Sequence, residues 1–192
     1  MVVTLDLRST VDLTDERFEQ ICQSNRDLKF ERTSIGELVV VALTGGETGR
    51  RNIKLSARLE MWNEEIGTGV AFDSSTGFRL PNGAIRSPDA AWIRLDRWQG
   101  LTTEQRKKLV PLCPDFVVEL RSPSDEIEEI QVKMKEYQEN GLRLGWLLDP
   151  ETQRVEIYRG DCTVEILENP TQLSGEGVLS GFVLNLMGIL LD

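Results

Sequence analysis

The sequence contains no histidine. This absence excludes Ser-His-Asp and Cys-His catalysis, histidine-ligated zinc and every scheme in which an imidazole ring transfers a proton. Any enzymatic chemistry must then depend on carboxylates, lysine, arginine, tyrosine or a hard metal ion. The missing residue type is the strongest constraint that the composition places on function.

Cysteine is also scarce. Cys22, Cys113 and Cys162 are widely spaced, and none of them belongs to a Cys-x-x-Cys pair. The pattern indicates neither a disulfide framework nor a zinc site, so we expect three free and mostly buried thiols. Cys113 would act as a nucleophile only if a base lay beside it.

No apolar run approaches the ~20 residues that span a bilayer. The N-terminal residues lack the basic and apolar regions of an export signal. We therefore expect a cytoplasmic protein without a membrane partner. The formal net charge of −10 argues against loose binding to nucleic acid, which depends on basic surface, but it leaves room for a local basic cleft.

A length of 192 residues fits one domain that covers residues 1–192. Helical and strand-like patterns interleave along the chain, which indicates the α/β or α+β class, with a mixed β-sheet flanked by helices. The run 38–43 is apolar on both faces, so we expect it to be a central strand. The expected helices cover 13–24, 44–66 and 125–140, with a short one from 103, and the expected strands cover 28–32, 37–43, 69–72, 77–80, 84–95, 115–121, 144–148, 154–159 and 162–167.

The longest expected helix has two faces with different chemistry. Its apolar face is wide and should lie on the sheet; it consists of Ile53, Leu55, Ala57, Leu59, Met61, Trp62 and Ile66. A basic stripe elsewhere on this helix is either a solvated face or a ridge that faces phosphate groups; it consists of Arg50, Arg51, Lys54 and Arg58. The glycines before the helix could present N–H groups to an anion, but no Gly-Lys-Ser or Gly-Lys-Thr follows, so this is not a P-loop.

The strand at 115–121 organises the candidate site. Side chains alternate along a strand, so Glu119 and Arg121 share one face, whereas Leu120 belongs to the opposite, apolar face. An acid and a base at the end of a core strand are costly to bury unless they are paired or used. The two side chains therefore form either an ion pair at the rim or part of a functional site.

The helix expected after this strand should return over the sheet. Ser124 is a suitable N-cap for it, and Gly141 a suitable stop. Its apolar stripe is Ile127, Ile130, Met134 and Tyr137. Lys133 borders that stripe whereas Lys135 points outward, so Lys133 can approach the end of the strand that carries Glu119.

Asp89 follows Pro88 at an expected strand bend and completes a constellation with Glu119, Arg121 and Lys133. Two converging carboxylates repel each other unless a cation lies between them, and Mg²⁺ or Mn²⁺ prefers such oxygen ligands. A nearby cation would neutralise charge that develops on a phosphoryl group. Each residue also has a simpler interpretation: Asp89 caps a turn, Glu119 pairs with Arg121, and Lys133 covers apolar surface with its stem.

Pro88-Asp89, followed thirty residues later by Glu119-Leu120-Arg121, resembles the PD-(D/E)XK pattern of the restriction-endonuclease-like superfamily, with arginine in place of the lysine. Four longer runs are similar to the Uma family of bacterial proteins within that superfamily, and weaker similarity extends from Phe30 to Phe182. The four runs are FDSSTGFRLPNG at 72–83, RSPDAA at 86–91, CPDFVVELRSPSD at 113–125 and KMKEYQENGLRLGWLLDP at 133–150.

The resemblance implies a core sheet of four or five strands, with Asp89, Glu119 and the Leu120 carbonyl as metal ligands. It also implies that Lys133 replaces the missing strand lysine, and it assigns an accessory acidic position to Glu31. Arg121 departs from the pattern, because a guanidinium stays charged and is a poor proton shuttle. Many members of the family have a histidine at the start of the long helix, where this chain has Arg51 and Asn52.

These observations lead to one hypothesis and one alternative. The hypothesis is an endonuclease that uses Mg²⁺ or Mn²⁺ to hydrolyse phosphodiester bonds in DNA, and that forms a homodimer suited to duplex cleavage. The alternative keeps the nuclease fold without catalysis, as a protein-binding or assembly module. The missing strand lysine, the missing histidine and the acidic charge favour this alternative.

Overall fold

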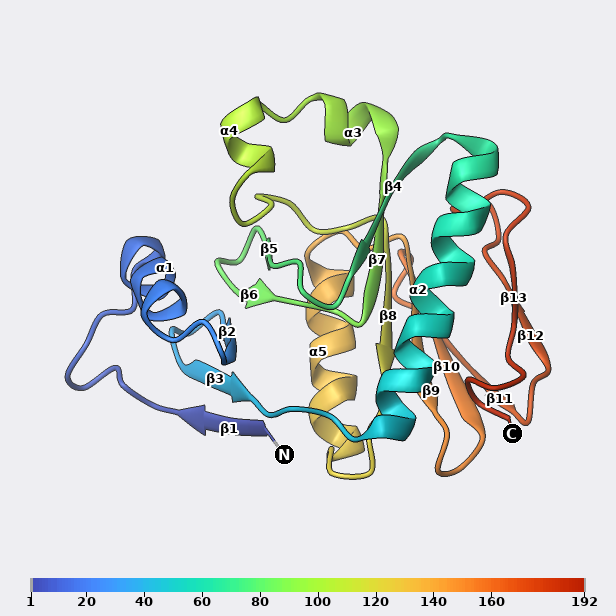
Figure 1. Ribbon diagram of the computed structural model, residues 1–192, viewed down its shortest axis with the longest axis horizontal. Helices are drawn as coiled ribbons and strands as arrows, with labels where there is room; N and C mark the ends of the chain where they lie inside the picture. Colours follow the sequence, from blue (N-terminus) through green and yellow to red (C-terminus); the bar gives the residue numbers. More distant parts are fainter. Residues whose placement is uncertain (1, 192) are drawn as a thin grey trace.

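The computed structural model describes residues 2–191 and contains a six-stranded mixed sheet as its main body (Figure 1). In this sheet β8 and β9 are parallel, and the other neighbouring pairs are antiparallel. The predicted mixed sheet with flanking helices is thus confirmed, with more strands than the four or five expected. In spatial order the strands are β11 (Val164–Glu168), β10 (Arg154–Arg159), β9 (Leu144–Asp149), β8 (Phe116–Leu120), β7 (Ala90–Arg94) and β4 (Gly69–Asp73).

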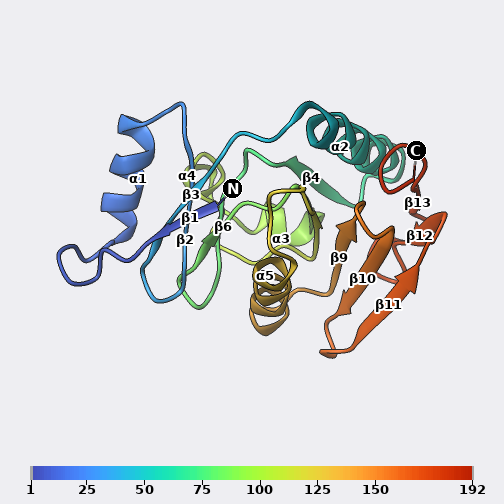
Figure 2. The same ribbon diagram turned by 90° about the horizontal axis from the view of Figure 1, so that it is seen from below.

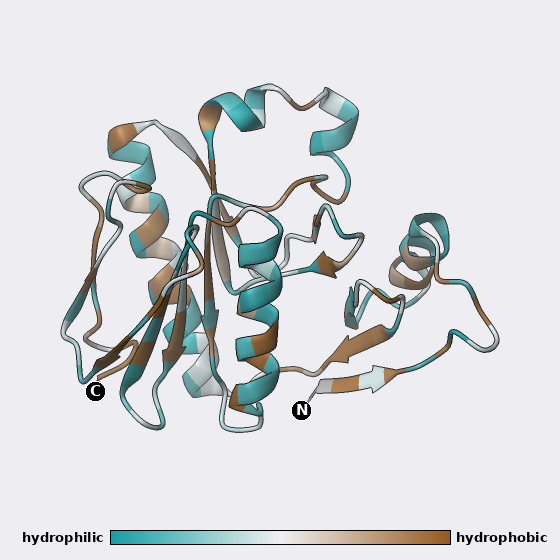
Figure 3. Cartoon of the chain, turned by 180° about the vertical axis from the view of Figure 1, so that it is seen from behind, coloured by the Kyte–Doolittle hydropathy of each residue, from teal (hydrophilic) through white to brown (hydrophobic). Residues whose placement is uncertain are grey.

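Two helices cover opposite faces of this sheet, α2 (Gly46–Ile66) and α5 (Ile127–Glu139), as Figure 2 shows. Brown, apolar segments alternate with teal ones along the strands and along both helices (Figure 3). Successive residues of β8 alternate between the two faces, so Val118 packs in the core on the α2 side and Val117 in the core on the α5 side.

The apolar face of α2 is narrower than the sequence predicted. Leu55, Leu59 and Trp62 are buried, but Ile53, Met61 and Ile66 are exposed; Ala57 is exposed as well. The helix contacts β4 and β7 near one edge of the sheet, so only one stripe of its surface meets the sheet.

A second sheet of five strands lies beside the main body, with α1 (Asp15–Ser24) next to it (Figure 1). The expectation that 38–43 is central in the core sheet is wrong, because β3 belongs to this second sheet and Leu43 is almost fully exposed. Leu38 instead packs with Phe18 of α1 in a separate small core. This strand, apolar on both faces, is therefore buried by a neighbouring helix rather than by the main sheet. The strands, in spatial order, are β1 (Val2–Leu5), β3 (Leu38–Val41), β2 (Lys29–Arg32), β6 (Ile85–Arg86) and β5 (Phe78–Arg79).

The start of α5 also differs from the prediction. Ser124 is not its N-cap, because the helix begins at Ile127 after Glu126. Asp125 accepts hydrogen bonds from the backbone N–H and the hydroxyl of Ser122. This local side-chain turn competes with helix and delays the first helical turn by two residues.

The remaining elements are short: α3 (Leu95–Gln99), α4 (Thr103–Arg106), β12 (Gln172–Ser174) and β13 (Val183–Asn185). The three thiols are free, but only Cys113 is buried, whereas Cys22 is half-buried and Cys162 is exposed. Burial raises the pKa of Cys113 to about 12, so this thiol is not a nucleophile at neutral pH. None of the helices in residues 2–191 has the length and apolar character that crossing a membrane requires.

Candidate functional site

The end of β8 brings Glu119 next to Asp89. In the pairing of β7 with β8, Ala90 is opposite Val118, so Asp89, which forms a bend just before β7, comes opposite Glu119. Pro88 cannot donate a ladder hydrogen bond, which explains why the chain bends before the strand starts. Two carboxylates from segments thirty residues apart thus reach the same end of the sheet.

Lys133 of α5 lies between two carboxylates. Its Nζ is 2.9 Å from Oε1 of Glu119 and 2.9 Å from Oε1 of Glu31 on β2. Glu31 and Glu119 are buried, and 17% of the Lys133 side chain is exposed, so the ammonium group reaches the cluster from its rim. We call Asp89, Glu119, Glu31 and Lys133 the acid–amine cluster.

Asp89 is fixed by one donor on each oxygen. Its Oδ2 accepts from the backbone N–H of Leu120 at 2.8 Å, and its Oδ1 accepts from Nδ2 of Asn52 on α2 at 3.0 Å. The first bond ties Asp89 to the strand end that carries Glu119. The second brings α2 into the site from the opposite face of the sheet.

The second sheet supplies the positive groups around Glu31. Arg86 Nη1 is 3.3 Å from Glu31 Oε2, and the backbone N–H of Ser87 donates to Glu31 Oε1 at 3.0 Å. Lys29, two residues before Glu31 on β2, donates to the carbonyl of Ser87 at 3.0 Å. The segment 86–89 therefore connects Glu31 of the second sheet to Asp89 at the start of β7 in the main sheet.

Burial and charge shift the ionisation of the cluster in opposite directions. Burial raises the pKa of Glu119 to about 7, and the charges of Asp89 and Glu31 add to the rise against the opposing effect of Lys133. Burial also raises the pKa of Asp89. Although burial alone would raise the pKa of Glu31, the charges of Lys133 and Arg86 outweigh it and lower the pKa. Burial opposes the charge on Lys133, but Glu119 and Glu31 raise its pKa, so the amine stays protonated.

Arg121 points away from this cluster. Its Nη1 is 2.9 Å from Oδ2 of Asp149 on β9, and its Nε donates to the carbonyl of Asp125 at 3.2 Å. The simpler interpretation of an ion pair between Glu119 and Arg121 is therefore wrong. The strand face is the predicted one, but the guanidinium extends along the sheet towards β9.

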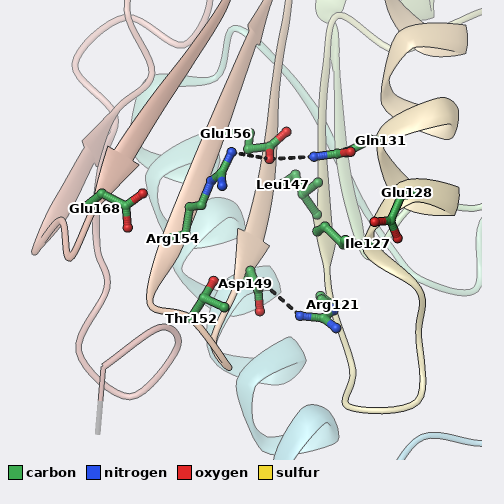
Figure 4. Close-up of a pocket in the computed structure, with 10 residues that line it drawn as sticks. All are labelled: Arg121, Ile127, Glu128, Gln131, Leu147, Asp149, Thr152, Arg154, Glu156 and Glu168. Carbon is green, nitrogen blue, oxygen red and sulfur yellow. Dashed lines mark hydrogen bonds and ion pairs between the residues drawn. The ribbon is translucent and has the colours of Figure 1, made fainter.

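Arg121 lines a cavity of about 430 Å³ on the far side of α5 (Figure 4). Two of its charged groups pair with each other, since Arg154 Nη2 is 3.1 Å from Oε1 of Glu156. The amide of Gln131 donates from Nε2 to the same oxygen at 2.8 Å. We call this site the arginine cavity; its walls are Arg121, Ile127, Glu128, Gln131, Leu147, Asp149, Thr152, Arg154, Glu156 and Glu168.

The basic stripe on α2 has partners within the protein. Arg50 pairs with Glu47 on its own helix, and Arg58 donates to the carbonyls of Asn185 and Met187. Lys54 lies so close to Gly188 that a Cβ there would clash with its Nζ. Arg58 and Lys54 thus fasten the C-terminal segment to the helix, and the phosphate-facing role of Arg50, Arg51 and Lys54 stays a prediction.

The sequence interpretation assigned no role in the cluster to three side chains that contact it: Tyr137, Asn52 and Arg86. Tyr137, assigned to the core, donates its hydroxyl hydrogen to Glu119 Oε1 at 3.1 Å. Its position four residues after Lys133 was a usable signal, because residues at this spacing share a helix face. Asn52 was named only as lying, with Arg51, where many members of the family have a histidine; its contact with Asp89 depends on how α2 crosses the sheet.

The donors at this strand end fit a small hard cation. Two carboxylates, the Leu120 carbonyl and an amide are oxygen groups of the kind that Mg²⁺ binds. Lys133 and Tyr137 both contact Oε1 of Glu119. Its other oxygen, Oε2, has no hydrogen bond or ion pair with the residues that the structure describes. Within the described residues no group of three or more His, Cys, Asp and Glu side chains is arranged to hold a metal. The protein would therefore supply few ligands and water the rest, which Mg²⁺ accepts.

Comparison with known proteins agrees with this fold. The fold is similar to that in the crystal structure of "a putative nuclease belonging to DUF820" from Anabaena variabilis, with a TM-score of 0.71 and 17% sequence identity. The match covers 84% of this chain and 89% of that chain, and at this identity it shows the fold alone. No curated protein matches the sequence.

The comparison with protein-family models identifies the family of this chain. The model of the Uma2 family, described as "Putative restriction endonuclease", matches residues 15–187. This match includes every residue of the acid–amine cluster, and it confirms the resemblance found in the sequence. The chain belongs to the Uma2 family.

Proposed function

We propose that the protein is a metal-dependent endonuclease that hydrolyses phosphodiester bonds in DNA. The observation that carries the proposal is the convergence of two carboxylates and one ammonium group from three segments, with Lys133 Nζ 2.9 Å from Glu119. Membership of a family described as restriction endonucleases supports it. In this proposal Asp89, Glu119 and the Leu120 carbonyl hold Mg²⁺ or Mn²⁺.

When bound, the metal ion would polarise a phosphoryl oxygen and make water a stronger nucleophile. Lys133 keeps its proton, so its task is electrostatic: it offsets negative charge on the phosphate as the transition state forms. Glu31 holds the ammonium group from the other side and fixes its position. Arg121 is left out of the reacting groups, because its guanidinium is bonded to Asp149.

The test is a plasmid-nicking assay with Mg²⁺ or Mn²⁺ and with a chelator. The wild type should nick DNA only with the metal, and Asp89→Ala should reduce the rate by about 10³-fold, because the metal supplies several kcal/mol of transition-state stabilisation. Glu168→Gln, at the wall of the arginine cavity, is the matched control and should nick at the wild-type rate. Equal rates for Asp89→Ala and the wild type would refute the proposal.

Two further expectations belong to it. A homodimer would present two sites related by a two-fold axis, which suits cleavage of both strands, and light scattering of the purified protein tests it. The expected location is the cytoplasm, where DNA is accessible. The alternative function, a protein-binding or assembly module without catalysis, gains some support from the position of Arg121 and predicts no metal-dependent nicking at all.

A further inference from the structure

The amide of Asn52 has one satisfied end and one unsatisfied end. Its Nδ2 donates to Asp89, but its Oδ1 is buried and has no hydrogen-bond partner in residues 2–191. A buried carbonyl oxygen without a partner costs about 1–3 kcal/mol. Native proteins leave few such groups, and a bound ion accounts for some of those that remain.

A rotated amide would not remove the problem. Exchanging the oxygen and nitrogen of Asn52 would place Oδ1 against the carboxylate of Asp89, and two acceptors repel each other. The orientation is therefore determined by Asp89, and the unsatisfied oxygen belongs to the same amide that contacts this carboxylate. The unsatisfied atom lies beside a residue already assigned to the metal.

The charge balance of the cluster favours a neutral ligand at this position. Asp89, Glu119 and Glu31 already bring three carboxyl groups together, and burial raises the pKa of Asp89 and of Glu119. A fourth carboxylate would add repulsion, whereas an amide oxygen adds a hard ligand without adding charge. A bare divalent ion is smaller than water and can contact an oxygen that water does not reach.

We propose that Asn52 is a ligand residue of the cation site, with Oδ1 in the coordination sphere of the ion that Asp89 holds. This inference depends on the proposed metal site and extends it to α2. Asn52 then has two tasks: its nitrogen orients Asp89, and its oxygen binds the ion. It follows that the site prefers Mg²⁺, Mn²⁺ or Ca²⁺ to Zn²⁺, which favours nitrogen and sulfur ligands.

Two substitutions separate these tasks, with Mn²⁺ affinity measured by titration calorimetry. Asn52→Leu removes both groups and should weaken binding by about 10-fold or more, as loss of a group that supports a metal site does. Asn52→Asp keeps one side-chain oxygen and replaces the N–H donor with a second oxygen and a negative charge; the added repulsion is relieved when the cation binds, so this variant should bind Mn²⁺ at least as tightly as the wild type. Asn169→Asp, on an exposed residue outside the cluster, controls for the added charge and should match the wild type.

The outcomes distinguish the inference from the proposal on which it depends. If the wild type binds no Mn²⁺, or binds it as tightly after Asp89→Ala, the metal site itself is refuted. If Asp89→Ala abolishes binding but Asn52→Leu does not weaken it, only the inference fails. Loss of binding in Asn52→Asp equal to that in Asn52→Leu would show that Asn52 only orients Asp89. Circular dichroism checks folding, and Asn52→Ser replaces Asn52→Leu if the latter does not fold.

Discussion

Two polar clusters flank α5 on the same face of the main sheet, and they differ in how their charges are balanced. In the arginine cavity each buried acid has a guanidinium of its own: Asp149 pairs with Arg121, and Glu156 with Arg154. In the acid–amine cluster one ammonium group, Lys133, is shared by two acids. The two buried acids of the cavity are thus each neutralised by a guanidinium, and the other two acids of its walls, Glu128 and Glu168, are exposed.

In the acid–amine cluster burial raises the pKa values of Asp89 and Glu119, and the charges of Asp89 and Glu31 add to the rise at Glu119. Perturbed carboxylates at a half-buried position are typical of functional sites. The cavity of about 430 Å³ belongs to the other cluster. Cavity volume and raised carboxyl pKa values thus point to different sides of one helix, and the raised pKa values are the better guide to the site.

The largest effect is expected from Lys133→Met. This change keeps the apolar stem but leaves Glu31 and Glu119 without their shared cation, and breaking a buried ion pair costs about 3–5 kcal/mol. The free energy of unfolding, measured by urea denaturation at pH 8, should fall by this amount. Lys135→Met, on the exposed side of the same helix, should change it by less than about 0.5 kcal/mol. Equal losses in the two variants would contradict the shared-cation account.

The pH dependence of stability sharpens the contrast. Because the pKa of Glu119 in the folded protein is about 7, above its ordinary 4.5, this carboxyl stabilises the fold at low pH. That stability is lost as the pH rises from 4.5 through about 7. The difference between the ordinary and the folded pKa corresponds to about 3 kcal/mol. The metal-free wild type should therefore lose up to about 3 kcal/mol more than Glu119→Gln between pH 4.5 and pH 8, measured by denaturation at each pH. Parallel profiles would refute the raised pKa.

How much of this site the sequence could predict depends on the range of the interactions. Glu119 and Lys133 were predictable from strand alternation and helix spacing, and Asp89 from its distance to Glu119 in the motif. The contact between Asn52 and Asp89 was not predictable, because it depends on how α2, which lies on one face of the sheet, is placed relative to the start of β7. The prediction for β3 was wrong because an apolar run does not reveal which of two sheets the strand will join.

A pair of tyrosines tests the two clusters with the same substitution. Tyr137 donates to Glu119 at 3.1 Å, and Tyr158 donates to Glu156 at 2.7 Å. Each Tyr→Phe change removes a hydrogen bond to a charged group and should cost about 1.5–3 kcal/mol of stability. Only Tyr137→Phe should also alter Mn²⁺ affinity in calorimetry. If Tyr158→Phe changed the affinity instead, the metal would bind in the arginine cavity, and the assignment of the metal to the acid–amine cluster would be wrong.

The smallest effect is expected from Arg121→Ala. After the loss of Arg121, Asp149 still accepts hydrogen bonds from the backbone N–H of Glu151 and the hydroxyl of Thr152, so the unfolding free energy should fall by only about 1 kcal/mol. Plasmid nicking should stay within roughly twofold of the wild type, because the guanidinium does not reach the acid–amine cluster. A much larger fall in nicking rate, with stability unchanged, would restore Arg121 to the reacting groups.

The central claim is that the cation site lies between Asp89 and Glu119. The most direct measurement is a crystal structure with Mn²⁺ soaked in and anomalous scattering recorded. The account predicts an anomalous peak within about 2.0–2.6 Å of an oxygen of each of these two carboxylates, the range for hard cations with oxygen ligands. A peak in the arginine cavity, or no peak at either carboxylate at saturating Mn²⁺, would contradict it.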